Sequence, residues 1–455
     1  MAGRRAVVMT TQRFPKYAEY KDTGWPWLAE VPVHWSIMRL GQLGTLSKGR
    51  GGTKADEAFE GIPCVRYGDL YTTHDGFIEK PRSYIPTGRA SDYTPIHPGD
   101  VLFAASGETL EEIGMSAVNL LQSGARCGGD IIILRPRAAL DSRFLGYATN
   151  SSVARAQKAT TGRGMTVYHI YGGALKGLAL PIPPLADQQA IAAFLDRETA
   201  EIDALIAKKE RLIELLDEQR TSLITQAVTK GLDPHVPMRD SGVEWLGEIP
   251  AHWDSDRIKW VARMESGHTP DKKVAAYWRD GDIPWVSLAD TGQLREVDYI
   301  ETTAAMTTSA GLANSSAHIL PAGTVVFSRD ASIGLCAITR AGMAVSQHFI
   351  GWVCGSRMLP EYLLFVLRSM TQELERVTMG ATVRTIGMPD VKRLATPIPT
   401  LSEQAAIVDH ILNHRTRLGR IIGKMREATD RVREYRTALI SAAVTGQIDI
   451  RGEVG

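Results

Sequence analysis

The chain contains the stretch Asp240-Ser-Gly-Val-Glu-Trp-Leu-Gly-Glu-Ile-Pro-Ala-His-Trp253 and a related one, Asp22-Thr-Gly-Trp-Pro-Trp-Leu-Ala-Glu-Val-Pro-Val-His-Trp35. Eight of the fourteen positions are identical, and the two stretches lie 218 residues apart. Further matches follow in the same order, Ile62-Pro63 with Ile283-Pro284 and the Pro-Ile-Pro runs at 181–188 with those at 397–404. Because the matches stay collinear along the chain, we infer an internal duplication.

Composition places the chain among ordinary globular proteins and limits its function classes. It has 455 residues, of which 44% are hydrophobic and 23% charged, enough for two or three domains. No run of 18 apolar residues is present, so no transmembrane helix and no membrane partner are expected. The four cysteines lack CxxC spacing, which predicts no disulfide framework or zinc site and fits a cytoplasmic location. A net charge of +1 excludes a uniformly basic nucleic-acid coat but not a local basic face.

Each half begins with a globular segment and ends in a long helical pattern. Short β-branched runs bounded by Gly and Pro, such as those at 130–134 and 323–327, indicate short strands. We expect an α+β fold, with two similar domains of twisted sheet plus helices separated by two long helices. The predicted boundaries are 1–184 for the first domain with a short N-terminal extension, 185–232 for the first helix, 233–398 for the second domain, and 399–455 for the second helix and C-terminal tail.

The two long helices are predicted from apolar residues that recur at alternating spacings of four and three. Such a heptad seam is typical of coiled coils, and one helix cannot bury its stripe alone. We therefore expect the helices to pair with each other, and chain length permits parallel or antiparallel pairing. The first helix is mainly acidic and the second mainly basic, which favours association modestly. The predicted seam positions are Ile191, Leu195, Ile202, Leu205, Leu212, Leu216, Leu223, Ile407, Ile411, Leu418, Ile421, Met425, Val432, Tyr435 and Leu439.

These motifs resemble the specificity subunit of type I restriction–modification systems (HsdS). The resemblance rests on the two Trp-Leu-x-Glu-x-Pro-x-His-Trp stretches, the two Pro-Ile-Pro runs, and the helix-closing Leu-Ile-Ser-Ala-Ala-Val-Thr-Gly-Gln-Ile-Asp at 439–449. It implies two target recognition domains joined by antiparallel helices, each domain reading one half of an asymmetric, two-part double-stranded DNA site. It also implies a non-catalytic subunit that docks two methyltransferase subunits and restriction subunits. S-adenosylmethionine, ATP and Mg²⁺ would then bind those partners and not this chain.

Candidate DNA contacts are basic, aromatic or polar residues, some of them at positions where the matched halves differ. Arg can bond guanine edges, Asn or Gln can bond adenine edges, and Lys or Arg also contacts phosphates. At an offset of 216, for example, Tyr168 stands where the second half has Arg384. The predicted contacts are Arg50, Lys54, Arg66, Tyr67, Arg163 and Tyr168 in the first domain, and Lys272, Lys273, Ser287, Arg329, Gln347 and Arg384 in the second.

No catalytic or metal site is predicted. A P-loop motif is absent, and the repeated His34 and His252 are interpreted as packing residues beside Trp35 and Trp253. Two alternatives stay open at this point. One is a specificity subunit of another methyltransferase–nuclease class, and the other is a coiled-coil scaffold without a DNA role.

Overall fold

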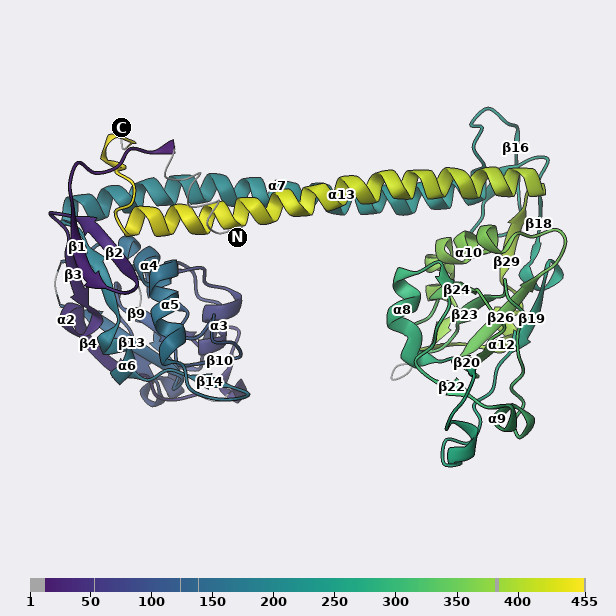
Figure 1. Cartoon of the computed structure of the whole chain (residues 1–455), viewed down its shortest axis with the longest axis horizontal. Helices are drawn as coiled ribbons and strands as arrows, with labels where there is room; N and C mark the ends of the chain where they lie inside the picture. The colour runs from purple at the N-terminus through teal and green to yellow at the C-terminus, as the bar shows by residue number, and fades with distance from the viewer. Residues whose placement is uncertain (1–12, 53, 123, 138, 381–383, 454–455) are drawn as a thin grey trace. The chain divides into compact units, whose positions relative to one another are not determined.

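The computed structural model describes residues 13–52, 54–122, 124–137, 139–380 and 384–453, and two helices dominate it (Figure 1). Helix α7 (Leu185–Lys230) has 46 residues and α13 (Leu401–Val444) has 44. At a rise of 1.5 Å per residue, each is roughly 65–70 Å long. A strand that contains proline precedes each helix. The first N–H groups of a helix have no acceptor within the helix, so proline, which lacks an N–H, is well tolerated where a helix begins. The two predicted long helices are confirmed.

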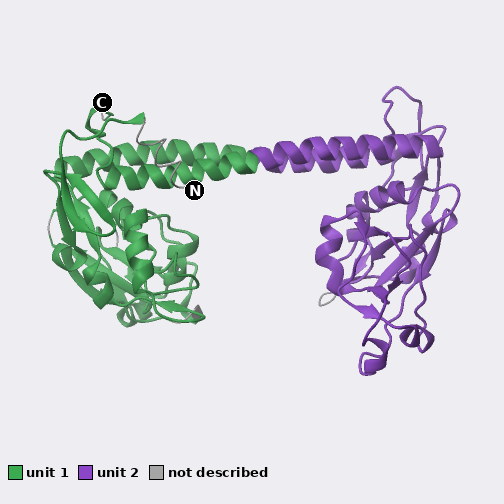
Figure 2. Ribbon diagram, in the orientation of Figure 1, with its two compact units in different colours: residues 1–210, 425–455 green, residues 211–424 purple. Residues whose placement is uncertain are grey.

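The chain divides into two compact units, each with one α+β domain and parts of both long helices (Figure 2). Unit 1 comprises residues 1–210 and 425–455, and unit 2 comprises residues 211–424. The first segment of α7 and the last of α13 thus belong to unit 1, whereas the remaining segments belong to unit 2. The mixed helix and sheet content of both domains confirms the predicted α+β fold class.

Unit 1 is built around a five-stranded sheet covered by two short helices. The sheet has the order β4-β13-β9-β11-β6, with bounds Gly44–Lys48, Ile131–Pro136, Val101–Ala104, Ser116–Asn119 and Phe77–Ile78. The helices are α4 (Ser142–Asn150) and α5 (Ser152–Thr161). A second sheet, β7-β5-β12-β8, comprises Ser83–Ile85, Ile62–Val65, Arg126–Cys127 and Thr94–Pro95.

Unit 2 repeats the main sheet strand by strand and three strands of the smaller sheet. Its main sheet has the order β19-β26-β23-β24-β21, with bounds Ala262–Ser266, Phe349–Cys354, Val325–Ser328, Cys336–Thr339 and Tyr299–Ile300. The matching helices are α10 (Pro360–Ser369) and α11 (Thr371–Arg376). The smaller sheet β22-β20-β25 comprises Met306–Thr307, Ile283–Val286 and Ala344–Val345. The duplication seen in the sequence is therefore a duplication of the fold.

The repeated His-Trp motif joins each domain to the start of a long helix. Trp35 and Trp253 are fully or nearly fully buried in the cores of units 1 and 2. The residues that follow them form β3 (Ser36–Arg39) and β18 (Asp254–Arg257), which pair with β15 (Ala179–Ile182) and β29 (Ala395–Ile398) directly before the helices. The adjacent histidines are bonded to helix carboxylates, His34 to Asp187 at 2.9 Å and His252 to Glu403 at 2.7 Å. This explains why the motif occurs once per half.

Within unit 1 the two long helices run antiparallel. Asp203 and Glu210 of α7 pair with Arg436 and Arg433 of α13, so residue numbers rise along one helix and fall along the other. The distance between Arg436 Nε and Asp203 Oδ1 is 2.8 Å. The acidic face of the first helix thus meets basic residues of the second, as the charge pattern favours.

The burial of the predicted seam residues follows the heptad pattern near the domains and departs from it elsewhere. The buried positions are Ile191, Leu195, Ile202, Ile407, Ile411, Leu418 and Leu439, and the half-buried ones are Leu216, Leu223, Met425, Val432 and Tyr435. The prediction is wrong at Leu205, Leu212 and Ile421, which are exposed. A straight α-helix drifts by about 20° per heptad from a 3.5-residue repeat, so neighbouring residues turn inward instead. Ile422 is 4% exposed, and Ile206 packs against the core of unit 1.

Charged side chains tie each domain to the long helices of its own unit. In unit 2 the Asp298 carboxylate accepts hydrogen bonds from Arg368 of α10 at 2.5 Å and from Arg415 of α13 at 2.8 Å. Burial raises the pKa of Asp298, but these hydrogen bonds outweigh that effect and hold the pKa below its usual value. In unit 1, Asp196 of α7 accepts from Arg143 at 3.2 Å and from Tyr147 at 2.7 Å, both on α4.

Candidate nucleic-acid interface

A short loop of unit 1 presents polar residues where two strands end. Strand β10 (Ser106–Gly107) pairs with β14 (Tyr168–His169), and two backbone hydrogen bonds of 3.0 and 2.8 Å between Arg163 and His169 close the loop before it. Gly164 has φ +148°, and a Cβ there would lie 2.0 Å from the carbonyl oxygen of Val167. The tight closure requires glycine at this position. It leaves the side chain of Arg163 exposed.

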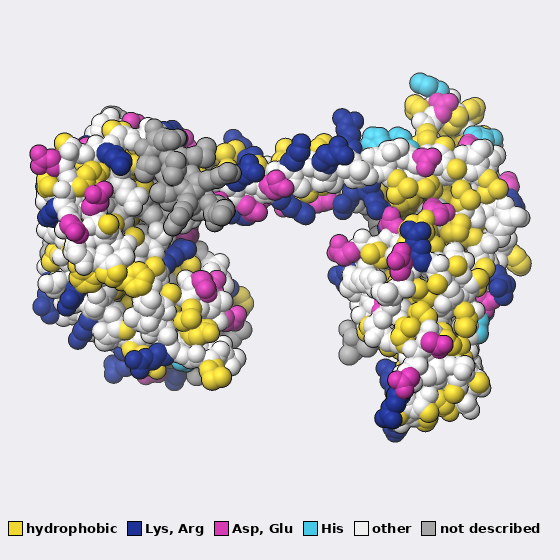
Figure 3. All heavy atoms as spheres, viewed as in Figure 1, with side chains coloured by type: hydrophobic (Ala, Val, Ile, Leu, Met, Phe, Trp, Pro, Cys, Tyr) yellow, Lys and Arg dark blue, Asp and Glu magenta, His cyan; other side chains and the backbone are white. Residues whose placement is uncertain are grey.

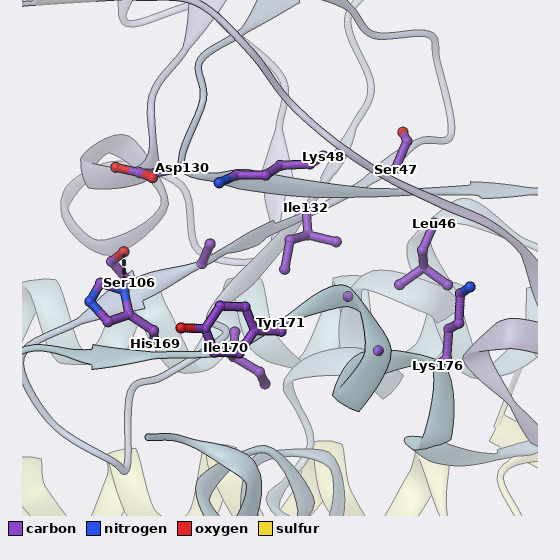
Figure 4. Close-up of a pocket in the computed structure, with 13 residues that line it drawn as sticks. Leu46, Ser47, Lys48, Ser106, Asp130, Ile132, His169, Ile170, Tyr171 and Lys176 are labelled. Carbon is purple, nitrogen blue, oxygen red and sulfur yellow. Dashed lines mark hydrogen bonds between the residues drawn. The ribbon is translucent and has the colours of Figure 1, made fainter. Parts of the chain in front are cut away.

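A hydroxyl and an imidazole are bonded at the base of this loop (Figure 4). Ser106 Oγ lies 3.0 Å from His169 Nδ1. Both residues line a cavity of about 270 Å³ whose wall also includes Lys48, Asp130 and Tyr171. Figure 4 shows the Lys48 side chain pointing toward Asp130, opposite the Ser106–His169 pair. Ser106 is buried, whereas His169 and Asp130 are exposed.

Unit 2 has the same arrangement of strand ends. The β9–β13 register pairs Ala104 with Ile131, and the β23–β26 register pairs Ser328 with Phe349. The residues that follow these pairs are therefore equivalent in the two units. Matching backbone hydrogen bonds support this, because the Ala105 N–H donates to the Asp130 carbonyl oxygen at 2.9 Å and the Arg329 N–H donates to the His348 carbonyl oxygen at 3.0 Å. A bridge joins Asp330 to Thr385 as the β10–β14 pair joins Ser106 to His169. The equivalent pairs are Ala105 and Arg329, Ser106 and Asp330, Asp130 and His348, Tyr168 and Arg384, and His169 and Thr385.

Different side chains occupy these equivalent positions. In unit 2, Asp330 Oδ2 lies 2.8 Å from His348 Nδ1, and Thr385 Oγ1 donates to Asp330 Oδ1. Arg329 Nε donates to the carbonyl oxygen of Gln347 at 3.2 Å, and its guanidinium also bonds the carbonyl oxygen of Ile386 at 3.1 Å. Each unit therefore presents a hydroxyl, a carboxylate and an imidazole at the same strand ends, in a different order. Such groups are suited to reading base edges by hydrogen bonding.

The predicted contacts of unit 1 lie on several loops around this edge. Arg50 is exposed, and its neighbour Gly51 accepts a backbone hydrogen bond of 2.9 Å from Gly129, beside Asp130. Tyr168 lies in β14, and Arg163 lies at the loop closure.

The remaining predicted contacts of unit 1 lie at or before short helices. Tyr67 begins helix α3 (Tyr67–Thr72) and is 45% exposed. Arg66 is half-buried and pairs with Glu57 at 2.8 Å, so its charge is already engaged. The side chain of Lys54 lies outside the described residues.

In unit 2 the structure brings together three of the six predicted contacts. Arg329 bonds the backbone of Gln347, and the carbonyl oxygen of Arg384 accepts from Ala331 at 2.8 Å. Lys272 and Lys273 are exposed in a turn that follows β19.

Ser287 is engaged within its own turn. It is 8% exposed, and its hydroxyl caps a 3-10 turn by accepting from the backbone of Ala289 and bonding Asp290. A DNA contact at Ser287 stays a prediction, and it would require this hydroxyl to leave its local partners.

Sequence reasoning missed the polar residues at the strand ends. Aligning the strands Gly99-Asp-Val-Leu-Phe-Ala-Ala-Ser106 and Gly323-Thr-Val-Val-Phe-Ser-Arg-Asp330 would have matched Ser106 with Asp330. The residues missed are Ser106, Asp130, His169, Asp330, His348 and Thr385.

Positive charge lies on two parts of the surface. In Figure 3, Lys and Arg side chains gather at the lower edge of unit 1, and others are interspersed with acidic and apolar side chains along the visible face of the long helices. Positive charge at such an edge would contact the phosphates that flank the bases.

Comparison with protein families identifies what this duplicated fold is. A family model described as "Type I restriction modification DNA specificity domain" matches residues 32–215 and 250–419. The chain belongs to this family. Each matched segment contains most of one α+β domain and the first part of the long helix that follows it, so the two α+β domains are the specificity domains of this family.

Curated relatives and solved structures agree with this assignment. The chain is 21% identical to the MjaVIII specificity subunit of Methanocaldococcus jannaschii, over 92% of this chain and 94% of that one. It is also 21% identical to the EcoKI specificity subunit of Escherichia coli K12, over 92% and 90%. A chain from a study titled "Structural basis underlying complex assembly and conformational transition of the type I R-M system" shares the fold at TM-score 0.71 and 17% identity, covering 92% and 99%. The HsdS subunit of Thermoanaerobacter tengcongensis matches at TM-score 0.51, also 17% identical, covering 92% and 98%.

Within the described residues, no group of three or more His, Cys, Asp or Glu is arranged to hold a metal ion. None of the helices described is both long and apolar enough to cross a membrane.

Proposed function

We propose that this chain reads an asymmetric, two-part DNA sequence for a type I restriction–modification complex, with one recognition domain for each half-site. The observation that supports this most strongly is the pair of equivalent strand ends. The framework is the same in both units, but Ser106, Asp130 and His169 stand where unit 2 has Asp330, His348 and Thr385. Two unlike readers on one scaffold suit two unlike half-sites, because no two-fold axis imposes a palindrome.

The long helices would set the distance between the half-sites. An antiparallel pair held by Asp203–Arg436 and Glu210–Arg433 is a stiff element. Two readers that enter the major groove on one side of a duplex need half-sites about one helical turn apart, roughly 34 Å. The helix length would then determine the number of unread base pairs.

Exposed apolar residues on the long helices support docking of partner subunits. In unit 2, Leu212 and Leu215 of α7 and Leu412 and Ile421 of α13 are 38–46% exposed, on helices that are otherwise polar outside their seam. Two modification subunits, and with them restriction subunits, would cover such surfaces. The partners would supply methyl transfer with S-adenosylmethionine and ATP- and Mg²⁺-dependent cleavage in the cytoplasm, and this chain would contribute recognition without catalysis.

Exchange of one recognition domain tests the proposal. Residues 50–180 are replaced by the matching segment of a relative with a different target, in the full chain assembled with its modification subunits. We expect one half-site to change and the other to persist when modified adenines are mapped across a genome. The reciprocal exchange in unit 2 is the control. A change in both half-sites after either exchange would contradict one reader per half-site.

Helix length provides the second test. Seven residues are inserted after Glu210 in α7 and seven before Arg433 in α13, so that the antiparallel register is kept on both sides of the insertion. We expect the spacer to lengthen by up to about three base pairs, the rise of seven helical residues. An insertion in α7 alone is the control and should impair assembly. An unchanged spacer in the paired variant would exclude the helices as the spacer determinant.

A further inference from the structure

The outward nitrogen of His348 has a hydrogen-bonding role that its neighbours determine. His348 Nδ1 lies 2.8 Å from Asp330 Oδ2. An ionised carboxylate only accepts, so Nδ1 of the neutral imidazole carries the proton and Nε2 is left as an acceptor. The amide nitrogen of Gln347 lies 3.4 Å from that Nε2, a long contact, so a DNA base that donates to Nε2 would displace it. The His348 side chain is 36% exposed, and the Asp330 side chain is 10% exposed.

Asp330 is itself held so that it cannot turn away from the imidazole. Thr385 Oγ1 donates to Oδ1, which directs Oδ2 toward His348. Arg329 lies 3.5 Å from the same Oδ2 and is fixed by its bonds to backbone carbonyl oxygens. The carboxylate therefore fixes which nitrogen of His348 carries the proton.

The equivalent imidazole of unit 1 has no such constraint. His169 Nδ1 bonds Ser106 Oγ at 3.0 Å, and a hydroxyl can either donate or accept. Both tautomers of His169 are therefore compatible with the contact, and among the described residues no hydrogen bond fixes whether its Nε2 donates or accepts. The two units differ in this property although their strand ends are equivalent.

We infer that His348 reads an amino-bearing base, adenine or cytosine, at one position of the second half-site, and that Asp330 is the positioning residue that sets this preference. In the major groove adenine N6 and cytosine N4 donate, whereas guanine and thymine present acceptors there. An acceptor nitrogen therefore favours adenine or cytosine on the DNA strand that it faces. His169, by contrast, accepts either class in the first half-site. The inference rests on the proposed DNA-reading function.

The decisive variant is Asp330→Asn in the full chain assembled with its modification subunits. The amide oxygen can still accept from Thr385, while the amide nitrogen donates to His348 Nδ1. The proton must then reside on Nε2, which becomes a donor. Methylation of a duplex library randomised in the second half-site measures the base preference at each position. At one position we expect this preference to invert from A or C to G or T, by about tenfold or more. A purely structural role of Asp330 would weaken methylation without inverting a base preference.

Two further variants keep the test decisive if Asp330→Asn folds poorly. His348→Ala removes a surface imidazole and should abolish discrimination at the same position while the first half-site stays unchanged. Ser106→Asp in unit 1 should create an A or C preference of about tenfold in the first half-site. An unaltered second half-site in both Asp330→Asn and His348→Ala, with methylation of the original site retained, overturns the inference and leaves the proposed function intact. A wild-type complex that methylates all library members equally overturns both.

Discussion

Unit 1 and unit 2 have the same strand order, but the ionic contacts that hold each domain to the helices differ. In unit 2 a single half-buried carboxylate, Asp298, whose side chain is 16% exposed, accepts from both Arg368 and Arg415. In unit 1 the corresponding contacts are spread over Asp196, which is 31% exposed, and Asp75, which is 73% exposed and pairs with Arg436 at 2.7 Å. One unit concentrates its charge interactions in a protected site, and the other distributes them at the surface.

The interiors differ in a similar way. Lys158 on α5 and Leu374 on α11 are equivalent, since each lies 3.0 Å from the Cβ that Gly114 or Gly334 would carry. Lys158 is 1% exposed and donates to the carbonyl oxygens of Gly114 and Thr149 at 2.7 and 2.9 Å, whereas Leu374 packs in the apolar core. Burial, with a smaller effect of Arg155, lowers the pKa of Lys158 to about 7. The fold is therefore specified by apolar positions and strand register, and charged residues can vary within it.

The largest difference is expected from removing the carboxylate that anchors unit 2. Asp298→Ala leaves two partly buried guanidinium groups without their shared partner, which should cost about 3 kcal/mol of unit 2 stability. The matched change in unit 1, Asp75→Ala, removes an exposed pair and should cost under about 1 kcal/mol. Hydrogen exchange of peptides from each unit in the full chain measures both losses. Equal losses in the two units would contradict the contrast between protected and distributed charge.

A pH titration should separate the two interiors next. The unfolded chain protonates Lys158 with the ordinary lysine pKa of 10.5, whereas the folded chain does so only near pH 7. Between these values the unfolded state binds a proton that the native state excludes, so unit 1 loses stability as the pH falls from about 10 to 7. Lys158→Met abolishes this titration. Its stability relative to wild type should therefore rise by about 1.4 kcal/mol for each pH unit lowered between 10 and 8.

The control for this titration is the equivalent residue of unit 2. Leu374→Met should change stability by under about 1.5 kcal/mol and independently of pH, because no titrating group is altered. Thermal unfolding at pH 8, 9 and 10 measures both variants against wild type. A Lys158→Met difference that does not vary with pH would mean that Lys158 is charged in the folded chain throughout this range.

Most of the fold is predictable from the sequence because it depends on local signals. The four-three spacing of apolar residues predicts both long helices, and the Pro-Ile-Pro runs mark where they begin. The pattern fails at Leu205, Leu212 and Ile421, which are exposed, because the 3.6-residue period of an α-helix drifts from the 3.5-residue repeat used to assign the seam. The local role of Ser287 is also visible in the sequence, because Ser287-Leu-Ala-Asp290 is a capping pattern that uses the hydroxyl within its own turn.

The candidate site is less predictable because it depends on long-range register. Arg384 is predicted from a difference between the aligned halves, whereas Arg329 and Gln347 are predicted from their residue type. Their meeting requires that β23 pairs with β26 and that Asp330 bridges to Thr385, 55 residues away. The roles of His169 and His348 depend on the same pairings, so the sequence shows the residues but not their hydrogen-bond partners.

The smallest predicted effect concerns the tryptophan beside each long helix. Glu403 bonds His252 and also accepts from the indole nitrogen of Trp253 at 3.1 Å. Asp187, one methylene shorter, bonds His34, and among the described residues the buried indole nitrogen of Trp35 has no partner. Asp187→Glu should supply that partner and stabilise unit 1 by about 1 kcal/mol, and Glu403→Asp should destabilise unit 2 by a similar amount.

Acid should remove the advantage of glutamate at this position. Burial raises the pKa of Glu403, but hydrogen bonds from His252, Trp253 and Thr400 outweigh that effect. They hold the pKa of Glu403 at about 2, below the usual 4.5. A lowered carboxyl pKa gives stability that is complete above about pH 4.5 and is lost as the pH falls toward 2. The difference between wild type and Glu403→Asp, followed by hydrogen exchange of unit 2, should therefore shrink over this range. A difference that persists undiminished at pH 2 would show that Glu403 acts through packing and not as a charged acceptor for the indole.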